Sequence, residues 1–297
     1  MATLYTHYDS NTRRTWVLMA AFFIAVIFLG WAFSWIFNNS IILYVAVFLS
    51  IAMNVGSYYY SDKLVLKMTG AHEASEKEYR ELHTLVENLA ITAGLPKPKV
   101  FVMKETAPNA FATGRNKEHA VVAVTEGLLT LLERTELEGV IAHELSHIGN
   151  RDMLVSTIAV TLVGFVTLLS DFFLRWSLFG GGGGDRDGRI QIIMTLVGVV
   201  LAILAPLVAL LIQLAISRKR EFLADASGAL LTRYPEGLAS ALSKIGKYSA
   251  EMKRANHATA HLFLANPFGS KKERGIHRWF MTHPPVSERI SALRGER

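Results

Sequence analysis

Long apolar runs alternate with polar stretches along the chain. Residues 16–37 and 41–60 contain no charged side chain. An α-helix rises about 1.5 Å per residue, so each run is long enough to cross a hydrocarbon core of roughly 30 Å. A cleaved signal peptide is the alternative for the first run, but that run is too long and no small-residue cleavage site follows it. The pattern therefore predicts a transmembrane hairpin over residues 1–60.

Two further apolar runs, residues 153–170 and 190–216, follow later in the chain. The glycines of residues 180–184 lie between them and are typical of a flexible connector. We expect a second hairpin over residues 153–216, in which each run spans the membrane. A buried helical hairpin of a soluble core is the alternative, because polar residues lie in or beside these runs: Asp171, Gln191 and Gln213.

Residues 61–152 and 217–297 have the mixed composition of a water-soluble domain. Residues 76–93 carry apolar side chains at helical spacing, while residues 100–103 and 120–124 are apolar runs of strand length. The long apolar runs and the mixed composition of residues 61–152 and 217–297 together predict a mainly α membrane protein. It would have four transmembrane helices and a soluble α+β domain that contains a small sheet.

Composition and charge support this class. Hydrophobic residues make up 51% of the chain and charged residues only 19%. The net charge of +6 does not indicate nucleic-acid binding, since no basic surface with interleaved aromatic residues accompanies it. Basic residues flank the apolar runs instead, and the positive-inside rule then places the N-terminus and both soluble parts in the cytoplasm. These flanking residues are Arg13, Arg14, Lys63, Lys67, Arg218, Lys219 and Arg220.

The stretch GVIAHELSHIGNRD, residues 139–152, carries the clearest chemical signal. On a helix, His143 and His147 project from one face, where both can bind one metal ion. Glu144 lies beside them, positioned to take a proton from a metal-bound water. The chain has no cysteine, so any metal must be held by histidines and carboxylates. A chance arrangement on an amphipathic helix is the alternative.

A catalytic zinc site needs a third protein ligand and an open position for water. Beyond the second apolar hairpin the chain reads SRKREFLAD, in which Glu221 and Asp225 share one helix face. We predict Glu221 as the third ligand and Asp225 as a residue that orients a ligating histidine or anchors the helix. The alternative for both carboxylates is a solvated helix face beside basic residues.

Several motifs follow one another in the chain: AHELSHIGNRD, an apolar hairpin, SRKREFLAD, and THPPVSERI near the C-terminus. With the two N-terminal apolar runs, they resemble the HtpX membrane zinc metalloproteases, relatives of the CAAX-processing Ste24 proteases, over nearly the whole chain. The resemblance implies a zincin-like domain with one zinc ion held by His143, His147 and Glu221, and Glu144 as the catalytic base. It also implies a bacterial inner-membrane enzyme that degrades damaged or misfolded membrane proteins.

The resemblance suggests roles for three further parts of the chain. Related zinc peptidases pair an Asn-Ala edge strand with extended substrate. Here that role falls on Asn109, Ala110 and Phe111. His283 is a candidate donor to the oxyanion of the tetrahedral intermediate, and Arg289 is a candidate partner for Asp225. A strand-to-loop junction, a loop histidine and an exposed helix charge are the respective alternatives.

A second histidine pair, His257 and His261, has the same spacing but no adjacent glutamate. We interpret it as a structural or substrate-groove feature. Three other functions are compatible with the pattern: a membrane-anchored scaffold or holdase with a structural metal, a transporter, and a prenyl-protein processing protease. Four apolar runs are too few for the large helical chamber that the last function implies. The sequence does not indicate the natural substrates or the oligomeric state.

Overall fold

The structure is a computed structural model that describes most of the chain. The described residues are 4–36, 38–150, 152–179, 192, 195–198, 200, 218–248, 250–254, 259–268 and 284–296. The second run of the expected hairpin over residues 153–216 lies largely outside them, as do His257 and His283.

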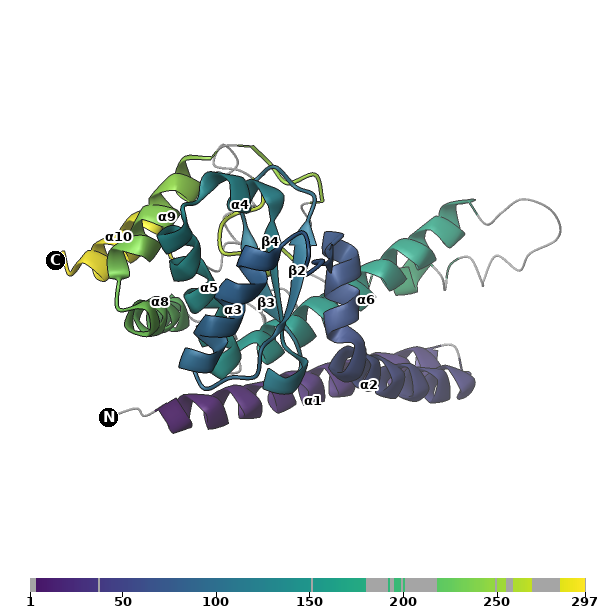
Figure 1. The fold of residues 1–297 in the computed structure, drawn as a ribbon. Helices are drawn as coiled ribbons and strands as arrows, with labels where there is room; N and C mark the ends of the chain where they lie inside the picture. Colours follow the sequence, from purple (N-terminus) through teal and green to yellow (C-terminus); the bar gives the residue numbers. More distant parts are fainter. Residues whose placement is uncertain are drawn as a thin grey trace.

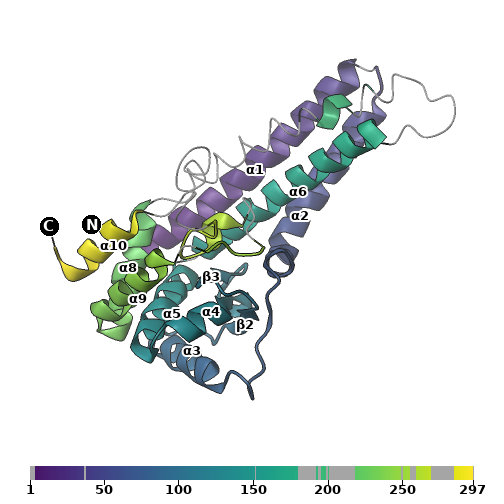
Figure 2. The same cartoon turned by 90° about the horizontal axis from the view of Figure 1, so that it is seen from above.

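Three long helices project together from one side of the molecule (Figures 1 and 2). They are α1 (Leu4–Ile36), α2 (Ile41–Thr69) and α6 (Asp152–Phe179). Within the described part of the chain, α2 and residues Thr15–Trp35 of α1 are long and apolar enough to cross a membrane. The structure thus has two candidate membrane spans at the positions expected for the N-terminal hairpin. Of the second expected hairpin, the structure describes one helix, α6.

Both helices of the N-terminal hairpin are longer than their apolar runs. Helix α1 begins at Leu4, within a polar segment. Helix α2 continues into the soluble domain, where Val65 and Leu66 are buried in its core. This burial explains why the helix does not stop at the end of the apolar run. Gly70 ends it with a φ of 68°, in the left-handed region that favours glycine.

A four-stranded sheet forms the soluble domain together with the remaining helices. Its strands are β1 (His72–Glu73), β2 (Lys99–Met103), β3 (Ala110–Thr113) and β4 (Val121–Thr125). They lie in the order β1-β2-β4-β3; β2 and β4 are parallel, and the outer two pairs are antiparallel. The two expected strands, residues 100–103 and 120–124, are confirmed as the adjacent central strands β2 and β4. Strand β3 lies at the edge next to β4.

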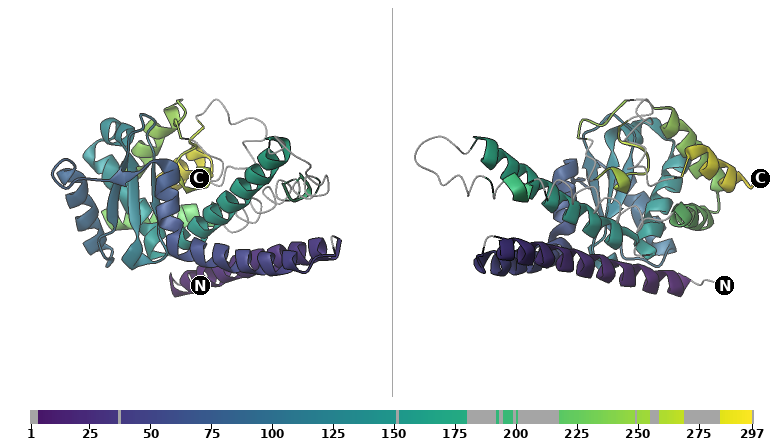
Figure 3. Two further views of the ribbon diagram at one scale, coloured as in Figure 1. Left: turned by 90° about the vertical axis from the view of Figure 1, so that its right-hand side faces the viewer. Right: turned by 180° about the vertical axis from the view of Figure 1, so that it is seen from behind.

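Helix α5 is the central helix of the soluble domain, which Figure 3 shows from two further sides at one end of the long helices. Its buried residues Val140, Ile141 and Leu145 belong to the main core, and it contacts β3, α3, α8 and α9. The domain's helices are α3 (Arg80–Thr92), α4 (Glu126–Leu131), α5 (Arg134–Gly149), α8 (Arg218–Thr232), α9 (Pro235–Lys247) and α10 (Val286–Arg294), with short 3-10 turns at Lys117–His119 and Ala260–Leu262. The helix expected over residues 76–93 is confirmed as α3.

Helix α6 joins the soluble domain to the N-terminal hairpin. It begins at Asp152, directly after α5, and packs against both α1 and α2. Its contact with the hairpin is an apolar cluster of Leu18, Phe22, Met53, Leu154, Ile158, Ala159 and Leu162. At the domain end, the hydroxyl oxygens of Thr157 in α6 and Thr113 in β3 lie 3.0 Å apart. The start of α6 is therefore held by both the sheet and the long helices.

Candidate metal centre

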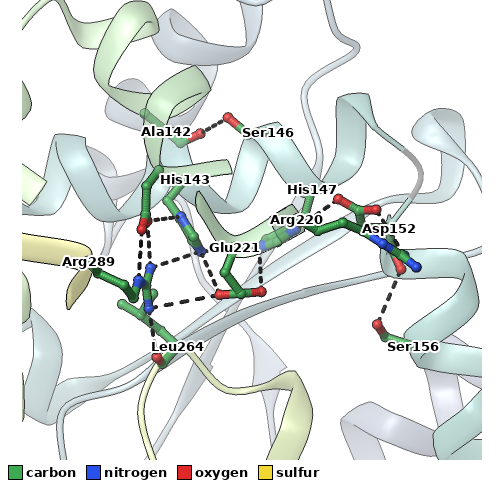
Figure 4. Close-up of polar contacts among 11 residues, drawn as sticks. Ala142, His143, Ser146, His147, Asp152, Ser156, Arg220, Glu221, Leu264 and Arg289 are labelled. Atoms are coloured by element: carbon green, nitrogen blue, oxygen red, sulfur yellow. Dashed lines mark hydrogen bonds and ion pairs between the residues drawn. The ribbon is translucent and has the colours of Figure 1, made fainter. Parts of the chain in front are cut away.

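Helix α5 presents His143 and His147 to a single glutamate of helix α8 (Figure 4). Their Nε2 atoms lie 3.1 Å apart. The carboxylate of Glu221 is 3.9 Å from the first Nε2 and 3.6 Å from the second. One donor atom from each residue lies within 4.8 Å of the other two. Tetrahedral zinc ligands at about 2.0 to 2.1 Å from the ion lie roughly 3.3 Å from one another, so these three side chains fit one ion.

The approach of α8 to α5 depends on Gly228. A Cβ atom at this position would lie 2.9 Å from the backbone nitrogen of His143, closer than real Cβ contacts. Two helix backbones can meet here because Gly228 has no side chain. Glu221 and Asp225, earlier on α8, then reach the histidines of α5. Both carboxylate residues are buried, so they do not form the solvated face that was the alternative.

The Nε2 atom of His143 faces His147 and Glu221, and its Nδ1 atom faces Asp225. Its Nδ1 lies 2.9 Å from Oδ1 of Asp225, and Arg289 donates two hydrogen bonds of 2.8 and 2.6 Å to the same carboxylate. Burial alone would raise the pKa of Asp225, but Arg289 and His143 outweigh it and lower this pKa to about 2. Arg289 is completely buried. It is therefore the partner of Asp225 and not an exposed helix charge.

His147 faces a different carboxylate, that of Asp152 at the start of α6. Its Nδ1 lies 3.3 Å from Oδ2 of Asp152, and Arg220 donates to Oδ1 at 3.2 Å. Burial disfavours the imidazolium, but Asp152, Glu221 and Glu144 stabilise it and raise the pKa of His147 to about 9. Sequence reasoning gave Asp152 no role and treated Arg220 only as a basic residue that flanks an apolar run. The one sequence feature that points to Asp152 is its position, five residues after His147 at the end of the motif.

Glu144 lines a cavity of about 30 Å³ that opens beside His147 and Glu221. A water needs only about 10 to 15 Å³ of such space, so at least one water fits beside the donors. Four elements contribute further lining residues: Ala112 from β3, Asp152, Met153 and Ser156 from α6, Arg220 from α8, and His261 and Leu262 from the turn at residues 260–262. Of the second histidine pair, His261 thus lies in the wall of the same cavity.

The edge of β3 is partly covered by the chain itself. The side chain of Asn109 accepts from the backbone N–H of Ala265 at 3.0 Å and donates to its carbonyl at 2.9 Å. The carbonyl of Ala110 accepts from the N–H of Leu264, and Phe111 is completely buried. The residues expected to bind substrate therefore contact residues 263–265 of their own chain.

Ala112 is the β3 residue that lines the cavity. The N–H of Thr125 donates to the carbonyl of Asn109, so Asn109, Phe111 and Thr113 form the hydrogen-bonded pairs with β4. Backbone groups alternate in an antiparallel pair, and those of Ala112 therefore point away from β4. Sequence reasoning missed this residue, because the alternation needs the register of the strand pair.

Comparisons with known proteins give the family of the chain. Residues 76–297 match peptidase family M48. The chain is 46% identical to a protein named Protease HtpX homolog from Caldanaerobacter subterraneus subsp. tengcongensis, over 98% of this chain and 97% of that protein. A Pyrococcus furiosus protein of the same name is 52% identical over 84% of this chain and 85% of its own length. In fold, the chain is similar to the crystal structure of S. mikatae Ste24p, with a TM-score of 0.50 at 18% identity, over 97% of this chain and 67% of that one.

We expect metal affinity to rise with pH until about pH 9. The raised pKa of His147, about 9 against an ordinary 6.5, means that its proton stabilises the metal-free fold below pH 6.5 and that this stabilisation is lost as the pH passes 9. A metal must displace that proton, so affinity should increase roughly tenfold per pH unit below 9. Zinc titration of the metal-free protein at pH 6.5, 7.5 and 8.5, corrected for the pH dependence of the competing chelator, measures this. An affinity that stays flat over the range would contradict it.

We expect Gly228→Ala to weaken metal binding by separating α8 from α5. The added Cβ would lie 2.9 Å from the backbone of His143, and overpacking of this kind costs about 1 to 3 kcal/mol. Gly149→Ala is the matched control, because a Cβ at that helical position meets nothing within 4 Å. Thermal unfolding and zinc titration of both variants provide the measurement. Equal zinc affinity in the two variants would show that the close approach does not shape the centre.

Proposed function

Because the chain belongs to peptidase family M48 and is a membrane metalloprotease, we propose that it is a zinc endopeptidase. Its donors are His143, His147 and Glu221, and its catalytic base is Glu144. The observation that carries the proposal is that three donor side chains converge within 4.8 Å, with Glu144 lining the cavity next to them. The metal that the family implies fits this donor set, since imidazole and carboxylate are the ligands of catalytic zinc.

The number of donors supports catalysis over a structural metal. A closed structural zinc site has four protein ligands, whereas a catalytic site has three and keeps one position for water. In the regions that the structure describes, the converging donor group has three members. The adjacent cavity, of about 30 Å³, is large enough to hold a water. A scaffold or holdase with a closed site would need a fourth donor from elsewhere in the chain.

The chemistry divides between the metal and the side chains. When bound, zinc supplies Lewis-acid polarisation of the scissile carbonyl and makes the attacking water more acidic. Glu144 then accepts the proton of that water and returns it to the leaving amine. Its carboxylate is 2% exposed and therefore acts away from bulk solvent. His283, which lies outside the described residues, is the proposed donor to the oxyanion, while Asp225 and Arg289 keep His143 in place.

Substrate backbone is proposed to pair with β3. An edge strand offers unpaired N–H and C=O groups to an extended peptide, and this pairing reads main chain more than side chains. Ala112 lines the cavity, and its backbone groups point away from β4, while Asn109 and Ala110 are engaged by residues 264 and 265. Pairing at Ala112 would place a substrate carbonyl beside Glu144. Asn109, Ala110 and Phe111 then contribute by shaping the strand.

The site's position suggests substrates at the membrane surface. Met153 and Ser156 in the cavity wall belong to α6, and this helix continues against α1 and α2. We propose that residues 1–60 and 153–216 form two membrane hairpins and that residues 61–152 and 217–297 form the cytoplasmic protease domain. In this arrangement, cleavable loops of misfolded or damaged membrane proteins in a bacterial inner membrane would reach the metal directly.

We expect Glu144→Gln to keep the fold and the metal but lose hydrolysis by about 10²- to 10⁴-fold, the usual contribution of a general base. The assay uses detergent-purified protein, stoichiometric zinc and casein as an unfolded substrate. Glu87→Gln, at an exposed glutamate that pairs with Lys97 on the surface, is the control and should retain wild-type activity. Undiminished casein cleavage by purified Glu144→Gln would remove Glu144 from its assigned role.

We expect Glu221→Gln to lower zinc affinity by at least about 100-fold, since a neutral amide replaces an anionic ligand and the loss exceeds that of a supporting residue. Competition with a chromogenic chelator measures the affinity, again with Glu87→Gln as the control. Thermal unfolding of the metal-free proteins shows whether the variant folds. A zinc affinity equal to that of the wild type would exclude Glu221 as a ligand.

A further inference from the structure

The two metal-binding histidines are held by two similar arrangements on opposite sides of the centre. In the first, Nδ1 of His143 lies 2.9 Å from Asp225, whose carboxylate accepts two hydrogen bonds from Arg289. In the second, Nδ1 of His147 lies 3.3 Å from Asp152, whose other oxygen accepts from an arginine at 3.2 Å. That arginine is Arg220, the residue before the proposed ligand Glu221. In Figure 4, Arg289 lies on one side of Glu221, and Arg220 and Asp152 lie on the other.

We infer that Asp152 and Arg220 are a second positioning pair, which orients His147 for the metal. The inference rests on the proposed metal centre. An imidazole that binds a metal through Nε2 carries its proton on Nδ1, and an acceptor facing Nδ1 sets both the tautomer and the ring orientation. Asp152 provides that acceptor through Oδ2, while Oδ1 is occupied by Arg220. The carboxylate therefore bridges the arginine and the histidine with separate oxygens.

The Asp152–Arg220 pair differs from a surface ion pair because both of its residues are buried. Asp152 is 5% exposed and Arg220 is 8% exposed. A buried carboxylate is unfavourable without a compensating partner, and Arg220 supplies both positive charge and a hydrogen bond. The hydrogen bond from the guanidinium holds the Asp152 carboxylate beside His147. A surface ion pair of the same residue types, such as Asp171 with Arg175 on α6, has no comparable constraint because both side chains are largely exposed.

The pair also joins three helices at one point. His147 lies in the last turn of α5, Asp152 is the first residue of α6, and Arg220 lies in the first turn of α8. Movement of α6 relative to α8 would therefore change the orientation of His147. The competing interpretation is a simple fastening of α6 to α8, which would affect folding stability but not the metal.

Zinc binding by Asp152→Asn tests the inference on the full-length, metal-free protein in detergent. We expect a 10- to 100-fold loss of zinc affinity, the usual effect of removing a residue that orients a ligand. Asp171→Asn is the matched control, since it breaks an Asp–Arg pair on the same helix but far from the donors. Arg220→Gln should weaken zinc binding in the same direction, and the double variant should be no weaker than Asp152→Asn, because Arg220 acts through that carboxylate.

A second readout separates orientation from stability. Co²⁺ in place of zinc reports ligand geometry through its visible absorption, and we expect Asp152→Asn to change the bands while Asp171→Asn leaves them as in the wild type. If wild-type protein and Asp152→Asn bind zinc equally well and give the same Co²⁺ spectrum, the inference is overturned and the proposed metal centre stands. If the wild type binds no zinc, both are overturned. If Asp152→Asn does not fold, Arg220→Gln decides: wild-type zinc affinity in that variant overturns the inference.

Discussion

The candidate metal centre depends on the contact between the backbones of α5 and α8. Gly228 has no side chain, so α8 lies against the backbone of His143. The first two turns of α8 then bring Glu221 and Asp225 to opposite sides of that histidine. Neither helix alone contains enough donors for a catalytic zinc ion. A packing contact between two helices therefore creates a chemical site that the isolated segments lack.

Charge is the second constraint on this contact. The described residues of the site include four buried carboxylates and two buried guanidinium groups: Glu144, Asp152, Glu221, Asp225, Arg220 and Arg289. With neutral histidines, this set has a formal excess of two negative charges, which is unfavourable inside a protein. The raised pKa of His147 partly offsets the excess in the metal-free protein. A divalent cation balances the two excess negative charges completely. The charges that are unfavourable in the metal-free protein therefore favour the binding of a metal.

The amino-acid sequence predicts the parts of this protein that follow from local spacing. His143 and His147 are one helical turn apart, as are Glu221 and Asp225, so each pair shares a helix face whatever the surrounding fold. The first apolar hairpin and the central strands are equally local. The contact of Asp152 with His147 is different, because it depends on the direction in which α6 leaves α5.

The edge of β3 also depends on contacts that local spacing does not predict, here between residues far apart in the sequence. The motif indicates a strand, and the structure has one at residues 110–113. Which of its hydrogen-bonding groups are already engaged depends on Leu264 and Ala265, far away in the sequence. No local pattern reports such a contact. The proposed pairing position, Ala112, could therefore be identified only from the strand register and the cavity lining.

The division of the donors along the chain has a consequence for biosynthesis. His143 and His147 are synthesised before α6, and Glu221 only after the whole segment from Asp152 to residue 217. Helix α8 must therefore be synthesised, and must pack against α5, before the three candidate donors can meet. A nascent chain that has been made only as far as α6 carries two of the three donors, both on α5.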